Sequence, residues 1–361
     1  MNITLIAASE LDASLQATWR ALQASHPALR SPYFAPEFTL AVAAVQPDVR
    51  IAVLEDGARV VGFFPHQARW RIGRPVGAPL SDHHGVVCAP GTRWDWLALL
   101  RASRLASWHF DHLPSAQAPQ HGACITAESP ALDLSRGMDA YLAARRASGV
   151  RSLGEFERKA RKLAREVGPL RFEAHTQNAQ VLATVLRLKS QQCRRTGTPD
   201  FFARPWTRAL VESIGTLQHP HFAGRLSALY AGDQLVGAHL GMRSATVWHW
   251  WFPVYSDAMA PYSPGAQLLL HVAHAAADAG CGLLDLGKGD DAYKRSFADC
   301  SLPLVEGWVA ARPALTFAWL AGRDAVGRWA RTSALTQPLR ALRQRTRLRM
   351  SARLPRPPAL P

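Results

Sequence analysis

Two segments of this chain carry the same pattern, and that repetition limits the folds open to it. Residues 51–65 read IAVLEDGARVVGFFP, and residues 226–240 read LSALYAGDQLVGAHL. In each, two apolar runs flank a turn that contains glycine, which is typical of a β-hairpin. At the offset of 175 residues (226 − 51) the identical pairs are Leu54/Leu229, Gly57/Gly232, Val61/Val236 and Gly62/Gly237.

A second similarity precedes each hairpin. The letters SPYF at residues 31–34 open one expected helix, and TPDF at residues 198–201 opens another. An aromatic residue follows early in each helix, Phe38 in the first and Trp206 in the second. Any two amphipathic hairpins look alike, but two similarities in the same order favour an internal duplication.

The second half predicts a mixed α/β architecture. Residues 247–254 (VWHWWFPV) form an expected strand, and Ser263 and Pro264 then mark a helix start, with Ser263 as N-cap. The helix is expected to end at Gly280, and residues 283–286 to form a short strand before a glycine-rich turn. A hairpin, a strand, a helix and another strand in this order indicate a mixed sheet covered by helices.

The helix start in the second half is the first candidate binding site. A strand that runs into a Ser-Pro-Gly-Ala helix start exposes backbone N–H groups beside a glycine, which suits a pyrophosphate. An ordinary capped helix explains the same letters and is favoured by the local sequence alone. The candidate cofactor-binding residues are Tyr262, Ser263, Pro264, Gly265, Ala266 and Gln267.

The turn after residues 283–286 is the second candidate. It follows the end of a strand, a usual place for ligand chemistry in open α/β sheets. Asp285 or Asp290 would accept a proton from an attacking amine or hydroxyl, and the choice between them stays open. Tyr293 would return a proton to a leaving group, and Lys294 would hold either phosphate or a developing oxyanion. A polar turn with helix-capping Asp residues is about equally consistent with these letters.

Four further residues are candidates for substrate binding, although core packing explains several of them equally well. His239 and His249 fall at strand positions, where a hydrogen-bonded core histidine is the ordinary alternative. The tryptophans of residues 247–254 are typical of sheet packing, although such a strand can also wall an acceptor cleft. The candidate residues are Lys189, His239, Trp250 and Lys288.

Metal, disulfide and nucleophilic-cysteine chemistry are not indicated. Two short runs, His83-His84 and His109-Phe110-Asp111-His112, contain residue types that bind metals. No third partner has helical or strand spacing that matches them, so no metal is predicted. The five cysteines are scattered without a CxxC pair, which argues against a disulfide framework and against a zinc site. Nothing at the N-terminus reads as a signal peptide and no apolar run is long enough to span a bilayer, so a cytoplasmic location is expected.

The net charge of +15 is concentrated in two places. Residues 145–166 hold eight basic and three acidic residues, and residues 323–361 hold ten Arg and one acid. The rest is nearly neutral, which argues against a nucleic-acid-binding core. The basic helix is expected to be a solvated face, or a surface for an anionic ligand or partner, and the tail is a second candidate for an anionic partner.

The two candidate motifs carry a family resemblance. YSPGAQLL at residues 262–269 and LLDLGKGDDAYKRSF at residues 283–297 resemble the signature of the CelD/BcsL-like acetyltransferases, GNAT-superfamily proteins similar to the Fem-type transferases. Leu188, Lys189 and the Arg195-Thr196-Gly197 run accompany the hairpin in the same pattern. Residues 81–85 (SDHHG) resemble the family's plsDy-g segment, with His in place of the usual aromatic. The resemblance covers roughly residues 30–310.

The resemblance implies two tandem GNAT-like domains and an acyl-CoA donor. The expected divisions are residues 1–135, a linking basic helix within 136–170, a catalytic domain at 171–312, and a helical, then Arg- and Pro-rich tail at 313–361. Acetyl-CoA would bind with its pyrophosphate at Ser263–Gly265, although GNAT phosphate loops usually hold more glycines than this one. No metal is implied. The acceptor would be a small molecule or glycan whose amine or sugar hydroxyl attacks the thioester. The resemblance also suggests a role in polysaccharide or cellulose biosynthesis, in the cytoplasm or peripheral to the inner membrane.

Two other functions fit the same sequence. A Fem-like enzyme would transfer an aminoacyl group from charged tRNA, and its basic helix and tail would contact the RNA. A catalytically silent protein would use the GNAT folds for binding alone. Nucleic acid is a partner only in the first of these alternatives.

Overall fold

The sequence repeat becomes a structural repeat within one compact unit, Met1–Ala311. The computed structural model describes residues 1–311, except 121–122, 151 and 290–291. The helix and tail expected at 313–361, and Asp290, lie outside the described residues. Among the described helices, none is long and apolar enough to cross a bilayer.

The first half begins with a strand and two helices, then turns into antiparallel strands. Its elements are β1 (Asn2–Ala7), α1 (Ala13–Ser25), α2 (Pro36–Val45), β2 (Val49–Asp56), β3 (Arg59–Arg69), β4 (Ile72–Arg74), β5 (Val87–Cys88), α3 (Trp96–Ala102), β6 (Ser107–Pro114) and β7 (Ala123–Asp133).

Two helices connect the halves, and the second half then follows the order of the first. Its elements are α4 (Met138–Ala147), α5 (Ser152–Glu166), β8 (Leu170–Glu173), α6 (Ala179–Thr196), α7 (Pro205–Thr216), β9 (Gln218–His219), β10 (Phe222–Ala231), β11 (Gln234–Arg243), β12 (Val247–Tyr255), α8 (Pro264–Asp278), β13 (Leu283–Asp285), α9 (Ala292–Phe297) and β14 (Cys300–Ala310).

The duplication holds element by element. In chain order β1, α1, α2, β2, β3, β4, α3, β6 and β7 correspond to β8, α6, α7, β10, β11, β12, α8, β13 and β14. The hairpins predicted from the repeat are β2–β3 and β10–β11, and Gly57 and Gly232 take positive φ at their turns. The fold is a tandem mixed α/β fold, as the duplication predicted.

Local details differ from the sequence-based expectation. The two corresponding helices begin at Pro36 and Pro205, each after a short 3-10 turn, because proline is well tolerated in the first helical turn and lacks the N–H that a helix start leaves unpaired. Residues 136–170 hold two helices, α4 and α5, where one was expected. Ser263 stands at the N-cap of α8 in a left-handed conformation, and its side chain makes no capping hydrogen bond.

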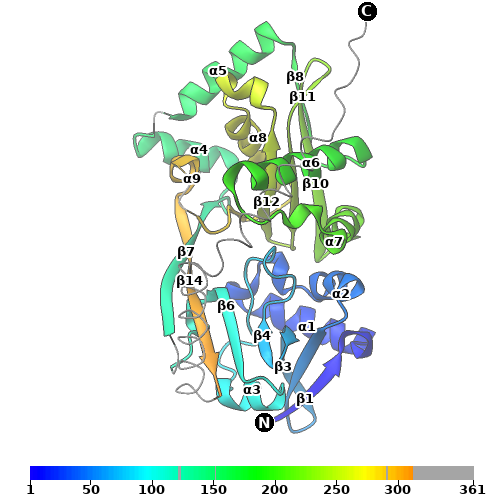
Figure 1. Ribbon diagram of the computed structural model, residues 1–361. Coiled ribbons are helices and arrows are strands. Elements are labelled where there is room, and N and C mark those ends of the chain that lie inside the picture. The colour runs from blue at the N-terminus through cyan, green and yellow to red at the C-terminus, as the bar shows by residue number, and fades with distance from the viewer. Residues whose placement is uncertain (121–122, 151, 290–291, 312–361) are drawn as a thin grey trace, which may run out of the picture. The chain divides into compact units, whose positions relative to one another are not determined.

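The halves exchange their last strands. β14, from the end of the second half, pairs antiparallel with β6 of the first half and with β7. β7, from the end of the first half, pairs in turn with β13 of the second. The described strands thus form one continuous sheet, in which β7 and β14 run side by side where the halves meet (Figure 1).

The exchange extends into the hydrophobic cores. One core cluster lies in the first half around Leu99, Trp108 and Phe64, and Val305 and Val309 of β14 complete it. A second cluster surrounds α8 in the second half, and Phe156 of α5 stacks on Phe297 of α9 beside it with ring centroids 5.2 Å apart. Residues far apart in the sequence therefore stabilise each core.

We predict that the first half depends on β14 for its stability. Val309 is 1% exposed, so Val309→Ala removes buried methyl groups from the core of the first half and should lower the free energy of unfolding by about 2 kcal/mol. Urea unfolding followed by circular dichroism should show a single transition at a lower midpoint. Ser301→Ala, at an exposed position of the same strand, is the control, and equal midpoints for the two variants would contradict the prediction.

Candidate active site between the two halves

The candidate site lies where two parallel strands separate. β12 and β13 pair from Val247–Leu283 to His249–Asp285, where β13 ends. β12 continues to Tyr255 without β13 beside it, and α8 follows. His249 and Asp285 are therefore neighbours at the point of separation.

Asp285 is fully buried and its two oxygens have separate sets of partners. Oδ1 accepts hydrogen bonds from Ser129 Oγ at 2.5 Å and from the Gly287 amide at 2.9 Å. Oδ2 lies 2.5 Å from His83 Nε2 and 3.2 Å from His249 Nδ1. Burial by itself would raise the pKa of Asp285, but the histidine charges and hydrogen bonds hold it well below the ordinary value.

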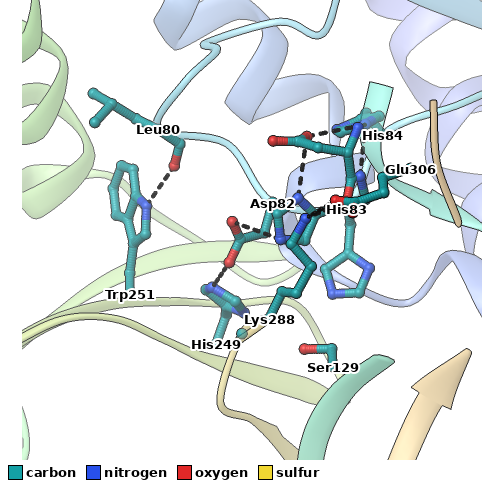
Figure 2. A network of polar contacts seen from close by, with 12 residues as sticks. Leu80, Asp82, His83, His84, Ser129, His249, Trp251, Lys288 and Glu306 are labelled. Carbon is teal, nitrogen blue, oxygen red and sulfur yellow. Dashed lines mark hydrogen bonds and ion pairs between the residues drawn. The ribbon is translucent and has the colours of Figure 1, made fainter. Parts of the chain in front are cut away.

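His249 joins the second half to the first. Its Nδ1 faces Asp285, and its Nε2 lies 3.0 Å from Oδ2 of Asp82, on the loop after β4 (Figure 2). Burial would lower the pKa of His249, but the two carboxylates outweigh it and raise the pKa to about 9. Burial would likewise raise the pKa of Asp82, but His249 and the neighbouring histidines lower it to about 2.

The contacts continue from Asp82 toward the solvent. Asp82 Oδ1 lies 3.3 Å from His112 Nε2, and His112 Nδ1 lies 3.1 Å from Asp111 Oδ1. Exposure of the three carboxylates rises along this path, from 0% at Asp285 to 24% at Asp82 and 54% at Asp111, while the histidines between them stay buried. We call the alternating series Asp285–His249–Asp82–His112–Asp111 the Asp–His chain.

Local structure holds the first-half members of the chain in place. His84 Nε2 accepts hydrogen bonds from the amides of Asp111 and His112 at 3.1 and 3.0 Å, and burial lowers the pKa of His84 to about 3, so its ring is neutral. Trp251 Nε1 donates to the Leu80 carbonyl at 2.8 Å (Figure 2). His83 directs its ring at Asp285 from a backbone with φ of +36°, a conformation rare outside glycine.

Gly287 is required by the close approach of the halves. Its φ is +72°, and a Cβ there would lie 2.9 Å from Asp82 Oδ2. A larger residue would therefore strain the turn and push Asp82 away from His249. The glycine that the sequence placed in a polar turn serves a contact with the other half.

His83, His249 and Asp285 also satisfy the simplest geometric condition for a metal site. One ligand atom from each lies within 4.8 Å of the others. The same atoms already contact one another, and His83 Nε2 and Asp285 Oδ2 are at hydrogen-bond distance. The described contacts account for the cluster without an ion, and we derive no step through a metal.

The structure places two predicted catalytic residues, Lys294 and Tyr293, and the predicted substrate-binding residue Lys288 at or after the 285–288 turn. Lys294 is buried and donates to the carbonyls of Gly287 and Lys288 at 3.0 and 3.1 Å. Lys288 donates to the Asp111 carbonyl at 3.1 Å and pairs with Glu306 of β14 at 2.6 Å. Tyr293 is partly buried and packs on the core around α8.

The predicted cofactor-binding segment lies against the basic helix. Ser263 Oγ accepts from Lys159 Nζ of α5 at 2.9 Å, and Tyr262 donates to Glu166. Gln267 is buried and donates to the Phe156 carbonyl, and Pro264 and Ala266 are buried as well. The amides of Ala266 and Gln267 both donate to the Ser263 carbonyl, so the loop offers fewer free N–H groups than the sequence suggested.

The predicted substrate-binding residues away from the turn do not join the Asp–His chain. His239 and Trp250 are buried and stack with ring centroids 4.2 Å apart. Burial holds the pKa of His239 well below its ordinary value, so the ring is neutral. Lys189, on α6, donates to Gln192 at 3.2 Å.

Sequence reasoning missed Asp82 and Ser129 as members of the site, and for His249 it favoured a core role over a place in the site. The polar run at residues 81–85 was visible, and the pattern of a strand end marked Asp285. The sequence did not show that the 81–85 run contacts Asp285, because His83 and Asp285 are 202 residues apart.

Comparisons with known proteins agree with this fold. Residues 152–295 match the family model described as an acetyltransferase (GNAT) domain, which is less than half of the chain. No curated protein matches the chain. Residues 152–295 therefore contain a GNAT-type domain, and the element-by-element repeat gives the first half the same architecture.

Solved structures resemble most of the chain at low sequence identity. A crystal structure named FemX has a TM-score of 0.52 at 11% identity, over 85% of this chain and 96% of that one. The C-terminal domain of a protein assigned as a lysylphosphatidylglycerol synthetase from Agrobacterium fabrum has a TM-score of 0.50 at 14% identity, over 86% and 96%. A tandem GNAT protein from the clavulanic acid biosynthesis pathway has a TM-score of 0.47 at 14% identity, over 86% and 99%. At these identities the likeness concerns the fold alone.

We predict that stability falls on the alkaline side of neutrality. His249 has a higher pKa when folded, about 9, than its ordinary 6.5. Its contribution is therefore complete below pH of about 6.5 and lost as the pH rises through about 9, a change on the order of 3 kcal/mol. Urea unfolding at about pH 6 and about pH 10 measures it. His249→Gln should reduce this difference, and a wild-type stability that is constant over the window would contradict the ion pair.

Proposed function

We propose that the protein is an acyltransferase that uses an acyl-CoA, most simply acetyl-CoA, as donor. The observation that carries the proposal is the separation of β12 and β13 at His249 and Asp285, after which β12 runs on to Tyr255, against Gly265 at the start of α8. The GNAT match over residues 152–295 supports it. Beyond His249, β12 is paired with β11 but not with β13. In our proposal an extended donor lies along the edge of β12 that β13 leaves, with its acyl carbonyl near the Asp–His chain.

We assign the pyrophosphate of the donor to the start of α8 and to α5. The N-terminus of a helix favours anions through its dipole. The loop has few free amides, and Lys159 and Lys162 of α5 add positive charge, since Lys159 contacts Ser263 and Lys162 lies 5.7 Å from the Tyr262 ring centre. The basic helix thus supplies charge that a glycine-rich loop would otherwise provide through its amides.

In the proposed reaction the acceptor attacks the thioester directly. The acceptor nitrogen or oxygen forms a bond to the acyl carbon, the carbon–sulfur bond breaks, and the CoA sulfur leaves as a thiolate that takes up a proton. The acceptor gives its proton to Asp82 as the new bond forms, because the attacking atom is then acidic enough for a carboxylate of low pKa to accept it. His112 passes the proton to exposed Asp111, which exchanges it with water, and the thiolate takes its proton from water. Asp285 is fully bonded and buried, so we assign it the positioning of His83 and His249 rather than the role of base.

The remaining catalytic assignments follow from the same turn. Lys294 holds the Gly287 and Lys288 carbonyls and so fixes the turn that carries Asp285, and an oxyanion role for Lys294 remains a prediction. Proton return by Tyr293 is likewise a prediction, and Asp290 lies outside the described residues.

The acceptor class is the least constrained part of the proposal. The resemblance to CelD/BcsL-like proteins favours an amine or a sugar hydroxyl, in a small molecule or a glycan, and a role in polysaccharide or cellulose production. CoA thioesters are cytoplasmic metabolites, so the proposal includes a cytoplasmic reaction.

We predict that acetyl-CoA binds and that Lys159 strengthens its binding. Isothermal titration should give a saturable signal, and Lys159→Gln should weaken the affinity about tenfold, since it removes a charge beside the pyrophosphate. Arg161→Gln is the matched control, because Arg161 is an exposed cation on the same helix. Absence of heat at millimolar acetyl-CoA would contradict the proposal, and strong, salt-sensitive tRNA binding in that case would favour Fem-like aminoacyl transfer.

We predict that Asp82→Asn slows transfer about a hundredfold without weakening acetyl-CoA binding, because the acceptor proton loses its first base. Chromatographic detection of free CoA with a panel of amines and sugars measures the rate. Asp278→Asn, at the exposed end of α8, is the control. Equal rates for the two variants would refute the proton path, and absence of transfer with any acceptor despite CoA binding would favour a binding protein without activity.

A further inference from the structure

The turn between β3 and β4 presents an unusual exposed side chain. Trp70 is 84% exposed, in a protein where most tryptophans are buried or partly buried. Arg69 and Arg71 flank it and are also exposed. An indole ring has a large apolar area, and a protein that leaves the ring in water forgoes the free energy of burying it. An exposed Trp between two cations therefore indicates a surface that contacts a partner.

The backbone of this turn is strained. The pairing of Arg69 with Ile72 leaves Trp70 and Arg71 as a two-residue loop, and both have positive φ, 54° and 63°. Such loops ordinarily carry Asn-Gly, because other residues resist this conformation. Here the strain places a tryptophan and an arginine at the tip of the hairpin, where an Asn-Gly pair would be more stable.

Two more arginines lie at the same edge. Arg101 and Arg104, at the end of α3 and just beyond it, are exposed, and Arg104 too has positive φ, 55°. The Ala106 amide donates to the Arg71 carbonyl at 2.8 Å, which joins the two loops. Among the described residues, none forms an ion pair with any of these four arginines. We call Arg69, Trp70, Arg71, Arg101 and Arg104 the Arg–Trp surface.

The last described residue is next to this surface. The Ala311 amide donates to the Ala106 carbonyl at 2.9 Å, so the chain leaves the described unit beside the loop that bears Arg104. The sequence that follows holds ten Arg and one acid over residues 323–361. Positive charge in the sequence therefore continues from a point beside the Arg–Trp surface.

We propose that the Arg–Trp surface docks on a membrane that contains anionic phospholipid. Tryptophan favours the interface between headgroups and acyl chains, and arginines near the surface are attracted by anionic lipids. A protruding two-residue tip can insert one ring between headgroups. A protein that binds a nucleic-acid strand instead has a positively charged groove that follows the phosphate backbone of the strand. The inference does not depend on acyl transfer.

The test removes the tip while improving the turn. The double variant Trp70→Asn with Arg71→Gly creates the loop sequence that a turn of this geometry favours. Its thermal stability should equal or exceed that of the wild type, so loss of binding cannot be ascribed to unfolding. Arg59→Ser is the control for charge, because Arg59 is an exposed arginine at the other end of β3, about 33 Å away by strand length.

Sedimentation of the full chain with vesicles gives the readout. Vesicles of phosphatidylcholine with one third phosphatidylglycerol should bind the wild type at low salt, and vesicles of phosphatidylcholine alone should bind it much less. The double variant should bind the anionic vesicles about fifty-fold more weakly than the wild type, because it loses one arginine and one inserted ring. Arg59→Ser should weaken vesicle binding by less than about twofold.

Two results would overturn the proposal. Equal vesicle binding by the double variant and the wild type would show that this tip does not contact lipid, even where the rest of the chain binds. Weak vesicle binding combined with tight binding of single-stranded RNA that depends on Trp70 would assign the surface to nucleic acid instead.

Discussion

The contact of His249 with Asp82 on one side and Asp285 on the other is the interaction on which the site depends. It places a charged imidazole between two carboxylates from different halves of the chain, at distances of 3.0 and 3.2 Å. A buried charge is costly without compensation, so each member of the trio requires the others. Ser129 and Gly287 donate to Oδ1 of Asp285, and His83 shares Oδ2 with His249. The exchange of β7 and β14 keeps the halves close enough for this arrangement.

The sequence was most informative where a pattern is local. The hairpins, β12, the proline start of α8 and the short strand before Asp285 all follow from alternation, turn residues and helix starts. These features also located Asp285 and the α8 start as candidate sites. The duplication was visible because the glycine turns of the two hairpins and the apolar residues around them are all separated by the same 175 residues.

The other parts of the fold and of the site could not be predicted from a single sequence, because they depend on pairings between residues that are distant in the chain. Nothing local indicates that β14 lies between β6 and β7, since its alternation would suit a neighbour in either half. Asp82 and Asp111 are ordinary loop and strand carboxylates until His249 and His112 are placed beside them. The contact between Lys159 and Ser263 likewise joins a helix that reads as a solvated basic face to the start of another helix. Charge patterning identified the basic helix, but the structure shows which of its lysines faces α8.

The exchanged strands have a consequence for how ligands reach the site. β14 is hydrogen-bonded along both of its edges, to β6 and to β7, and β7 is bonded to β13. Rotation of one half against the other would break hydrogen bonds on both edges of β14, so the described strands do not favour a hinge at this boundary. Opening and closing around a substrate must therefore come from loops and side chains, such as the segment that carries Asp82. The two copies of the fold are thus joined through shared strands of one sheet rather than through a linker alone.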